Sequence, residues 1–495
     1  MKRNYFLKTL GLGTAGMLVG ESLLSGCMNH DMAATSMANA PTVAEGTFTT
    51  VLSIPETITS GTALNARSQN AAILAGKSGQ VLGYKNGILG PTFRIQRGST
   101  VTIPFTNGLS EVTNIHWHGL LVPAAMDGHP DQMVMPSQSF NYTFKIDQAA
   151  NMAWYHPHPH EKTGKQVFMG LAGMFIIESP EEKELNLPSG NYELPLVIQD
   201  KRLDANGAIM YSPTLEEVMI GYMGETITVN GVSSPFHPVT TRMYRIRVLN
   251  GSNGRMYNLA LSNGDAFTVI GSDGGLLPAP ETVTSLLLAP GERADLLVDF
   301  SKTAINSEIF LQSNSFSGVS SQGSQTFKIM KFTVSKAETD TFNMPTSLNT
   351  IVPFSATSTT KTRTFDIGIA MDMAAGHGGS MAMKGMHTIN GKIYSSERID
   401  ETVIVNSAEI WEFDNTNGDE PHPMHLHGTF FQVISRTGGR GNILPHEKGL
   451  KDTVLAMPGE KVRIIVKFER IGKFVFHCHN LEHEDDGMML NFEVK

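Results

Sequence analysis

Residues 288–300 read LAPGERADLLVDF, and residues 456–468 read AMPGEKVRIIVKF. In both stretches a Pro-Gly turn precedes a run rich in apolar residues, and a weaker third copy begins at Met135-Pro136 and ends at Phe144. A turn that leads into a short apolar run is typical of a β-strand. Because the copies lie about one domain length apart, the repeat predicts several β-domains of one design.

Length and composition support three such domains. The chain has 495 residues, of which 17% are charged, with 48 Gly and 24 Pro, and this composition argues against long charged helices. From Thr47 onward, short apolar runs are separated by Gly, Pro, Asn and Asp, as in β-sandwiches. We therefore expect an all-β chain with three consecutive β-sandwich domains, at residues 47–180, 190–336 and 357–495.

Charge and cysteine content exclude two classes of protein. The formal net charge is -9 and the pI is about 6.0, so the chain lacks the broad basic surface of a nucleic-acid-binding protein, and no nucleic acid partner is expected. The two cysteines are too few for a disulfide framework.

The N-terminus has the pattern of an export signal. A basic segment at residues 2–8 precedes an apolar stretch at residues 10–24 that is too short for a convincing membrane span. The sequence Leu24-Ser25-Gly26-Cys27 that follows resembles the end of a bacterial lipoprotein signal. This resemblance implies that residues 1–26 are removed, that Cys27 carries a lipid anchor to a membrane, and that the protein lies in the periplasm or cell envelope.

Other interpretations of this N-terminus stay open. Cleavage after Ala38-Asn39-Ala40 would give an ordinary secreted protein, although that position lies far beyond the apolar stretch. Residues 2–8 also resemble a twin-arginine signal in which Lys2 replaces the first arginine, so the export route is undecided. Residues 27–46 have no apolar periodicity and are predicted to be a flexible tether.

Ten of the 17 histidines fall into four short clusters, each of which contains a His-x-His pair. In an extended strand, residues i and i+2 point to the same face, so each pair presents two imidazoles to one side. Four such pairs in one chain predict a site with several metal ions. The ten histidines are His116, His118, His156, His158, His422, His425, His427, His477, His479 and His483.

The last cluster indicates which metal is bound. Cys478 lies between His477 and His479, and the same alternation points its side chain to the opposite face. One thiolate, two imidazoles and a weak axial thioether from Met488 form a set that selects copper for electron transfer. A zinc site and a nucleophilic cysteine are alternative interpretations, although the paired cysteines usual for zinc are absent from the sequence.

Four motifs together resemble the copper-binding motifs of the three-domain multicopper oxidases. They are HWHG at 116–119, WYHPH at 154–158, HPMHLHG at 422–428 and HCHNLEHEDDGMM at 477–489. The Asn-Gly turns at 228–231 and 388–391 and the segment 245–251 resemble further family markers. Within the family, the chain is most similar to the bacterial periplasmic cuprous oxidases of the copper efflux oxidase type.

The resemblance implies three consecutive cupredoxin-like Greek-key domains and four copper ions, one of type 1, one of type 2 and two of type 3. The implied type 1 ligands are His422, Cys478, His483 and Met488. The implied type 2 ligands are His116 and His425. The implied ligands of the two type 3 ions are His118, His156 and His479 for one, and His158, His427 and His477 for the other.

The resemblance also implies a reaction, in which electrons from a donor enter at the type 1 copper and reduce O2 to water at the other three ions. Asp127 and Glu484 resemble acidic positions that deliver protons in the family. Alternatively, these carboxylates orient a histidine N–H. Four further histidines are expected to be bystanders, namely His129, His160, His237 and His446.

The electron donor is predicted from a methionine-rich loop at 371–387, which holds five Met among Gly, Ala and Ser. Thioethers select Cu(I), and the cuprous oxidases carry a Met-rich insertion here. The candidate Cu(I) residues are Met371, Asp372, Met373, Asp419 and Glu420. We therefore expect a copper-tolerance enzyme that oxidises Cu(I) with O2. The alternatives are a laccase acting on phenols or other small organic donors, and a non-catalytic protein that sequesters copper or has a structural role in the envelope.

Overall fold

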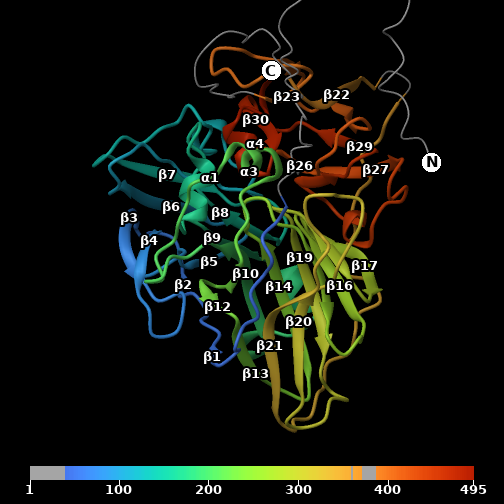
Figure 1. Cartoon of the computed structure of the whole chain (residues 1–495). Coiled ribbons are helices and arrows are strands. Elements are labelled where there is room, and N and C mark those ends of the chain that lie inside the picture. Colours follow the sequence, from blue (N-terminus) through green and yellow to red (C-terminus); the bar gives the residue numbers. More distant parts are fainter. Residues whose placement is uncertain (1–38, 358–359, 371–385) are drawn as a thin grey trace, which may run out of the picture. The chain divides into compact units, whose positions relative to one another are not determined.

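The computed structural model describes residues 39–495 except 358–359 and 371–385, and these described residues form one compact unit. Its strands form six sheets, which pair into three sandwiches (Figure 1). The prediction of an all-β chain is confirmed. Among the described residues, no helix is long and apolar enough to cross a membrane.

The first sandwich encloses a core rich in aromatic side chains, including Phe93, Phe105, Trp117 and Phe175. One sheet has the order β4 (Gly79–Gly83), β3 (Leu64–Ala71), β6 (Thr100–Asn107), β7 (Ser139–Lys145). The other has the order β2 (Thr57–Ile58), β5 (Thr92–Gln96), β9 (Gly173–Glu178), β8 (Met152–Tyr155).

The second sandwich is built on β10, whose nine residues are all buried, as expected for a strand covered on both faces. Its sheet has the order β12 (Val232–Ser233), β11 (Thr226–Val229), β10 (Glu193–Lys201), β14 (Met243–Asn250), β19 (Arg293–Asp299), β16 (Phe267–Ser272), β17 (Gly275–Val283). The facing sheet has the order β1 (Thr50–Val51), β13 (Pro235–Thr240), β21 (Phe327–Lys336), β20 (Glu308–Ser313), β15 (Tyr257–Leu261), β18 (Leu286–Leu288).

The third sandwich shows the strand alternation most clearly, since every second residue of β25 is buried. One sheet has the order β23 (His387–Ile389), β22 (Thr362–Ile369), β25 (Ala408–Asn415), β29 (Glu460–Lys467), β27 (Phe431–Thr437). The other has the order β24 (Glu401–Val403), β31 (Met489–Val494), β30 (Gly472–Cys478), β26 (His422–Leu426), β28 (Thr453–Ala456).

The few helices are short and lie between strands. The α-helices are α1 (Thr163–Phe168), α2 (Pro180–Glu184), α3 (Leu215–Ile220) and α4 (Leu481–Asp485). The 3-10 helices are η1 (Ala124–Met126), η2 (Gly190–Tyr192) and η3 (Pro445–Lys448).

The sequence repeat corresponds to one β-turn used three times. In each copy the fourth turn residue donates its N–H to the carbonyl of the first, at 3.1 Å for Glu292 to Ala289, 3.0 Å for Glu460 to Met457 and 3.0 Å for Gln138 to Met135. The residue after the proline has a positive φ, 82° at Gly291, 78° at Gly459 and 65° at Ser137. Such a turn favours Pro followed by Gly. A serine at the strained position explains why the third copy was weak in the sequence.

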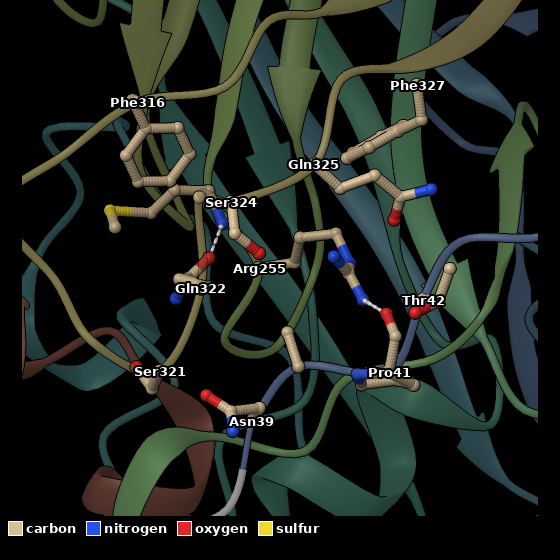
Figure 2. A pocket seen from close by; sticks show the side chains of 13 residues that line it. Asn39, Pro41, Thr42, Arg255, Phe316, Ser321, Gln322, Ser324, Gln325 and Phe327 are labelled. Atoms are coloured by element: carbon tan, nitrogen blue, oxygen red, sulfur yellow. Dashed lines mark hydrogen bonds between the residues drawn. The ribbon is translucent and has the colours of Figure 1, made fainter.

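The N-terminal segment differs from the expected tether. The Ala40 N–H donates to Ser321 O at 2.7 Å, the Ala44 N–H donates to Glu225 O at 2.9 Å, and Val43 is buried. Figure 2 shows part of this contact, in which Arg255 of the middle domain donates to Pro41 O at 3.4 Å. The predicted flexible tether is therefore wrong for residues 39–46, because their backbone pairs with the middle domain.

The first domain begins later in the structure than the predicted boundary at residue 47. Strand β1, at Thr50–Val51, pairs in parallel with β13 of the middle domain and not with the first sandwich. The chain thus contributes an edge strand to the second sandwich before it enters the first.

Candidate metal centre

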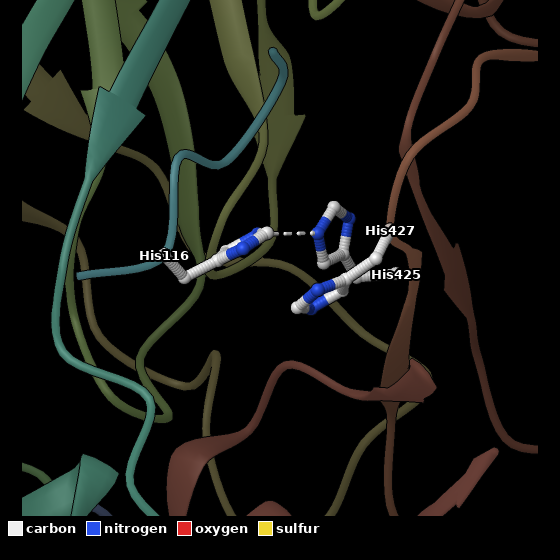
Figure 3. A group of neighbouring side chains, drawn as sticks. All are labelled: His116, His425 and His427. Atoms are coloured by element: carbon white, nitrogen blue, oxygen red, sulfur yellow. Dashed lines mark hydrogen bonds between the residues drawn. The ribbon is translucent and has the colours of Figure 1, made fainter. Parts of the chain in front are cut away.

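Strand pairing, together with the residues that directly follow the paired positions, brings eight of the predicted histidines together. In the third domain, β26 and β30 are antiparallel, with His425 opposite His477 and Met424 opposite Cys478. In the first domain, an antiparallel bridge joins His116 to His156. The imidazoles of both pairs of segments meet at the interface of the two domains, and Figure 3 shows His116 facing the other domain's His425 and His427. The eight side chains are at most 1% exposed: His116, His118, His156, His158, His425, His427, His477 and His479.

Several of these imidazoles point the same ring nitrogen at one another. The Nε2–Nε2 distances are 3.1 Å between His158 and His477, 3.1 Å between His427 and His477, and 3.4 Å between His116 and His425. Burial lowers the pKa of each ring, in the case of His477 to about 4, so the rings are neutral.

The other ring nitrogen of each of four imidazoles donates to an oxygen. The Nδ1–H of His116 donates to Asp127 O at 2.7 Å, that of His425 to Asp452 O at 2.9 Å, that of His477 to Cys478 O at 3.0 Å, and that of His427 to the Asp127 carboxylate at 2.7 Å. A neutral imidazole has one N–H, so the Nε2 atoms carry lone pairs. Lone pairs held about 3 Å apart repel unless a cation lies between them, and this arrangement fits copper ions.

Three further imidazoles present buried nitrogens that lack hydrogen bonds. Within the part of the chain that the structure describes, His118 Nδ1, His156 Nε2 and both nitrogens of His479 have no partner. The His479 ring centroid lies 5.0 Å from that of His118 and 5.4 Å from that of His156. Buried polar atoms are rarely left without a partner, so these nitrogens are available to a metal. They belong to the set predicted for one type 3 ion.

A second group surrounds Cys478. Its Sγ lies 3.5 Å from His422 Nδ1 and 3.7 Å from His483 Nδ1, and the two nitrogens are 3.2 Å apart. The Nε2–H of His483 donates to Met219 O at 3.0 Å, which leaves its Nδ1 free to bind a metal. Burial raises the pKa of the thiol, so a cation is needed to hold it as a thiolate. Met488 is buried in the same core, and its carbonyl accepts the Cys478 N–H at 3.0 Å.

Both predicted acids lie against the histidine cluster. One Asp127 carboxylate oxygen accepts from His427, while its backbone carbonyl accepts from His116. Glu484 lies between His158 Nδ1, at 3.4 Å, and His477 Nδ1, at 3.2 Å. Burial raises the pKa of both carboxyls. This geometry suits the orientation of imidazoles, and it also places a proton store beside the cluster.

The candidate donor residues are only partly brought together. Glu420 is buried, and one of its carboxylate oxygens accepts the Ser321 hydroxyl at 2.6 Å. Asp419 is exposed. Met371, Asp372 and Met373 lie outside the described residues.

Sequence reasoning missed two side chains at the site. Asp452 accepts from His118 Nε2 at 3.0 Å, and no motif marks it. The His387 ring stacks on that of His483, with centroids 3.9 Å apart and planes at 17°. Its position at the end of the Met-rich segment was a usable signal. The four predicted bystanders belong to none of the metal-sized groups found among the described residues.

Comparison with known proteins agrees with this arrangement. Models of the multicopper oxidase family match residues 65–182, 216–331 and 368–495. The chain is 36% identical to multicopper oxidase mco of Staphylococcus haemolyticus over 83% of both chains. It is 33% identical to a laccase of Bacillus subtilis, over 83% of this chain and 90% of the laccase.

A solved structure shows the same architecture. The multicopper oxidase of Campylobacter jejuni, described as a metallo-oxidase, superposes with a TM-score of 0.78 at 30% identity, over 92% of this chain and 96% of the other. The fold is therefore three cupredoxin-like domains. With three family matches, copper-suited donor sets and oxidases among its relatives, the chain belongs to the multicopper oxidases and is an oxidoreductase with copper cofactors.

Proposed function

We propose that this oxidase takes its electrons from Cu(I), which leaves as Cu(II), and passes them to O2 in a copper-tolerance role. The observation that carries the proposal is the burial of both imidazoles beside Cys478, since His483 is 0% and His422 is 4% exposed. A phenol needs an accessible imidazole edge for close contact. A metal ion needs carboxylate or thioether ligands, and Glu420 stands two residues before His422.

The C-terminal end of the Met-rich segment adds to this argument. Met386 and His387 both donate backbone N–H groups to Asp486, at 2.9 and 3.0 Å. His387 also stacks on His483. The sequence that supplies thioethers thus ends against a predicted type 1 ligand. The relative described as a metallo-oxidase is consistent with a metal donor, whereas the relative named laccase keeps the organic donor as the alternative.

We propose the copper ligands that the family motifs imply, with four ions in all. When bound, the copper ions carry four electrons from the donor to O2, which is released as water. The type 1 ion would be held by His422, Cys478, His483 and Met488, and the other three ions by the eight histidines at the domain interface. Because Cys478 is the sequence neighbour of both His477 and His479, one short peptide segment joins the two metal sites.

Asp127 and Glu484 are proposed to supply protons for the reduction of O2. Each carboxyl is fully buried against an imidazole of the cluster, and the raised pKa keeps a proton on it at a pH where an exposed carboxyl would be ionised.

A cavity lies near the histidine cluster, where the three domains meet. A space of about 400 Å³ is lined by residues from all three domains and includes Leu121, Gly428 and Thr429. The same three residues border a narrower recess that reaches His116, His425 and His427 but has no space open to a water-sized sphere, so O2 passes along it only if side chains move.

We also propose that the protein is exported and anchored through Cys27 in the cell envelope. The support is the lipoprotein-like signal, and Cys27 itself lies outside the described residues.

The donor is tested by deleting residues 373–386 and, separately, by Glu420→Gln, which keeps the Ser321 hydrogen bond but removes the charge. Both changes should lower Cu(I) oxidation by about tenfold or more, while oxidation of a phenol is kept or raised. Oxygen consumption with each donor, measured on one preparation, checks this. Asp419→Asn tests the second candidate carboxylate, which is exposed, in the same way. Parallel loss of both activities in the deletion variant would contradict Cu(I) as the donor.

Catalysis itself is tested at Cys478. Cys478→Ser should lose the strong blue absorption of the copper-loaded protein and at least about a hundredfold of the activity with any donor. Met488→Leu should keep the blue colour, because the axial thioether is a weak ligand. Blue absorption that survives in Cys478→Ser would favour a non-catalytic copper protein.

The variant Asp127→Asn distinguishes two roles of Asp127, the delivery of protons and the orientation of the His427 ring. The asparagine oxygen can still accept from His427, but the side chain cannot release a proton. Steady-state turnover should therefore fall by about a hundredfold, while anaerobic reduction of the blue copper by the donor is unchanged. Normal turnover would mean that Asp127 only orients the ring.

The anchor is tested by Cys27→Ser in the full chain, expressed in a Gram-negative host with radiolabelled palmitate. The parent should carry the label and sediment with membranes, and the variant should do neither. Cys478→Ser serves as the cysteine control and should stay labelled. A parent that remains unlabelled would refute the lipid anchor.

A further inference from the structure

Arg293 is a fully buried guanidinium that contacts all three domains. Its Nε–H donates to Met152 O of the first domain at 2.9 Å. Its Nη1 and Nη2 donate to the two carboxylate oxygens of Asp452 in the third domain, at 2.6 and 2.5 Å. Within its own domain it also donates to Gly291 O and Asp273 O. Its planar fork is therefore held on every side, which fixes the Asp452 carboxylate in position.

Asp452 in turn contacts two of the cluster histidines. Its Oδ1 accepts from His118 Nε2 at 3.0 Å, and its backbone carbonyl accepts from His425 Nδ1 at 2.9 Å. The Thr453 hydroxyl donates to the same Oδ1 at 2.9 Å and lies 3.2 Å from His118 Nε2. The two rings are stacked, with centroids 3.7 Å apart and planes at 10°. One residue thus sets the orientation of both imidazoles.

The consequence is opposite protonation of two stacked rings. His425 is protonated on Nδ1 and presents Nε2, which lies 3.4 Å from His116 Nε2. His118 is protonated on Nε2 and presents Nδ1, a buried atom that has no hydrogen-bond partner in the described ranges 39–357, 360–370 and 386–495. A carboxylate that fixes a histidine tautomer in this way tunes metal affinity.

The packing leaves no space for an alternative arrangement at this point. Gly119, the last residue of the HWHG motif, has φ of 84°, and a Cβ there would lie 2.5 Å from Arg293 Nη2 and 3.0 Å from Asp452 Oδ2. The glycine that follows His118 is thus required by the guanidinium and the carboxylate that orient His118.

We propose that Arg293 and Asp452 form a positioning pair through which the middle domain, which supplies none of the predicted copper ligands, controls assembly of the histidine cluster. The pair aligns His118 and His425 for the type 3 and type 2 ions respectively. This inference rests on the copper assignment of the proposed function. An ordinary ion pair between domains would hold the domains together without affecting the occupancy of the cluster.

The neighbouring ion pair offers a matched control. Glu292 is also buried in the middle domain and pairs with Lys451 of the third domain at 3.0 Å, but its other oxygen accepts the Ala289 N–H. Within the described part of the chain it makes no ion pair with a predicted ligand. Glu292→Gln therefore perturbs the same interface without altering the orientation of a cluster imidazole.

Two variants test the pair in the full copper-loaded chain. Asp452→Asn places an amide against Arg293. The combined change Arg293→Met and Asp452→Leu removes both charges and keeps apolar volume, a swap that buried ion pairs often tolerate. Copper per chain, the blue type 1 absorption and the type 2 electron paramagnetic resonance signal are measured, together with thermal unfolding with and without copper.

We expect both variants to keep the blue absorption but to lose at least about half of the cluster copper and to show an altered type 2 signal. The rise in unfolding temperature on copper loading should shrink in both, whereas Glu292→Gln should match the parent. Full cluster occupancy with a normal type 2 signal in a folded variant would overturn the positioning role, even if its copper-free form is less stable. A parent that binds a single copper would instead refute the copper assignment of the proposed function.

Discussion

The structure depends on one electrostatic constraint, the meeting of neutral imidazole lone pairs in a fully buried interface. Nε2 atoms from the first and third domains approach to 3.1 Å, and burial keeps the rings uncharged. Without a cation this contact is repulsive, and a cation bound between the rings would link the two domains. Cluster occupancy and the docking of these two sandwiches are therefore coupled.

The repeated turn shows how the middle domain takes part in this contact. Gly291, in the stretch that first revealed the domain repeat, adopts a positive φ, and a Cβ at that position would lie 2.9 Å from the His479 ring. Arg293, two residues later, reaches Asp452 and through it His118. The Pro-Gly turn that precedes a strand in the third domain thus has a second role in the middle domain, where the equivalent turn packs against the histidine cluster.

The sequence predicted the fold and the clustering of the histidines because both arise from local patterns. Strand alternation and His-x-His spacing are visible within a few residues. The structure brings both imidazoles of each pair into one cluster, although the second histidine of each pair lies just beyond its strand or bridge. Arg293 and Asp452 could not be found this way, since their roles depend on pairing across 159 positions of sequence. The ordering of residues 39–46 was missed for a related reason, because it depends on backbone hydrogen bonds, which leave no mark in composition.

The middle domain also contacts residues at the Cys478 site, as it does at the histidine cluster. Ser321 of the middle domain holds Glu420 through its hydroxyl, at 2.6 Å, and accepts the Ala40 N–H through its carbonyl, at 2.7 Å. Met219, also of the middle domain, accepts from His483. Groups at both metal sites are thus oriented by the domain that supplies none of the predicted ligands. A substitution in that domain can therefore alter either site without touching a copper ligand, and the two effects are separable because different residues carry them.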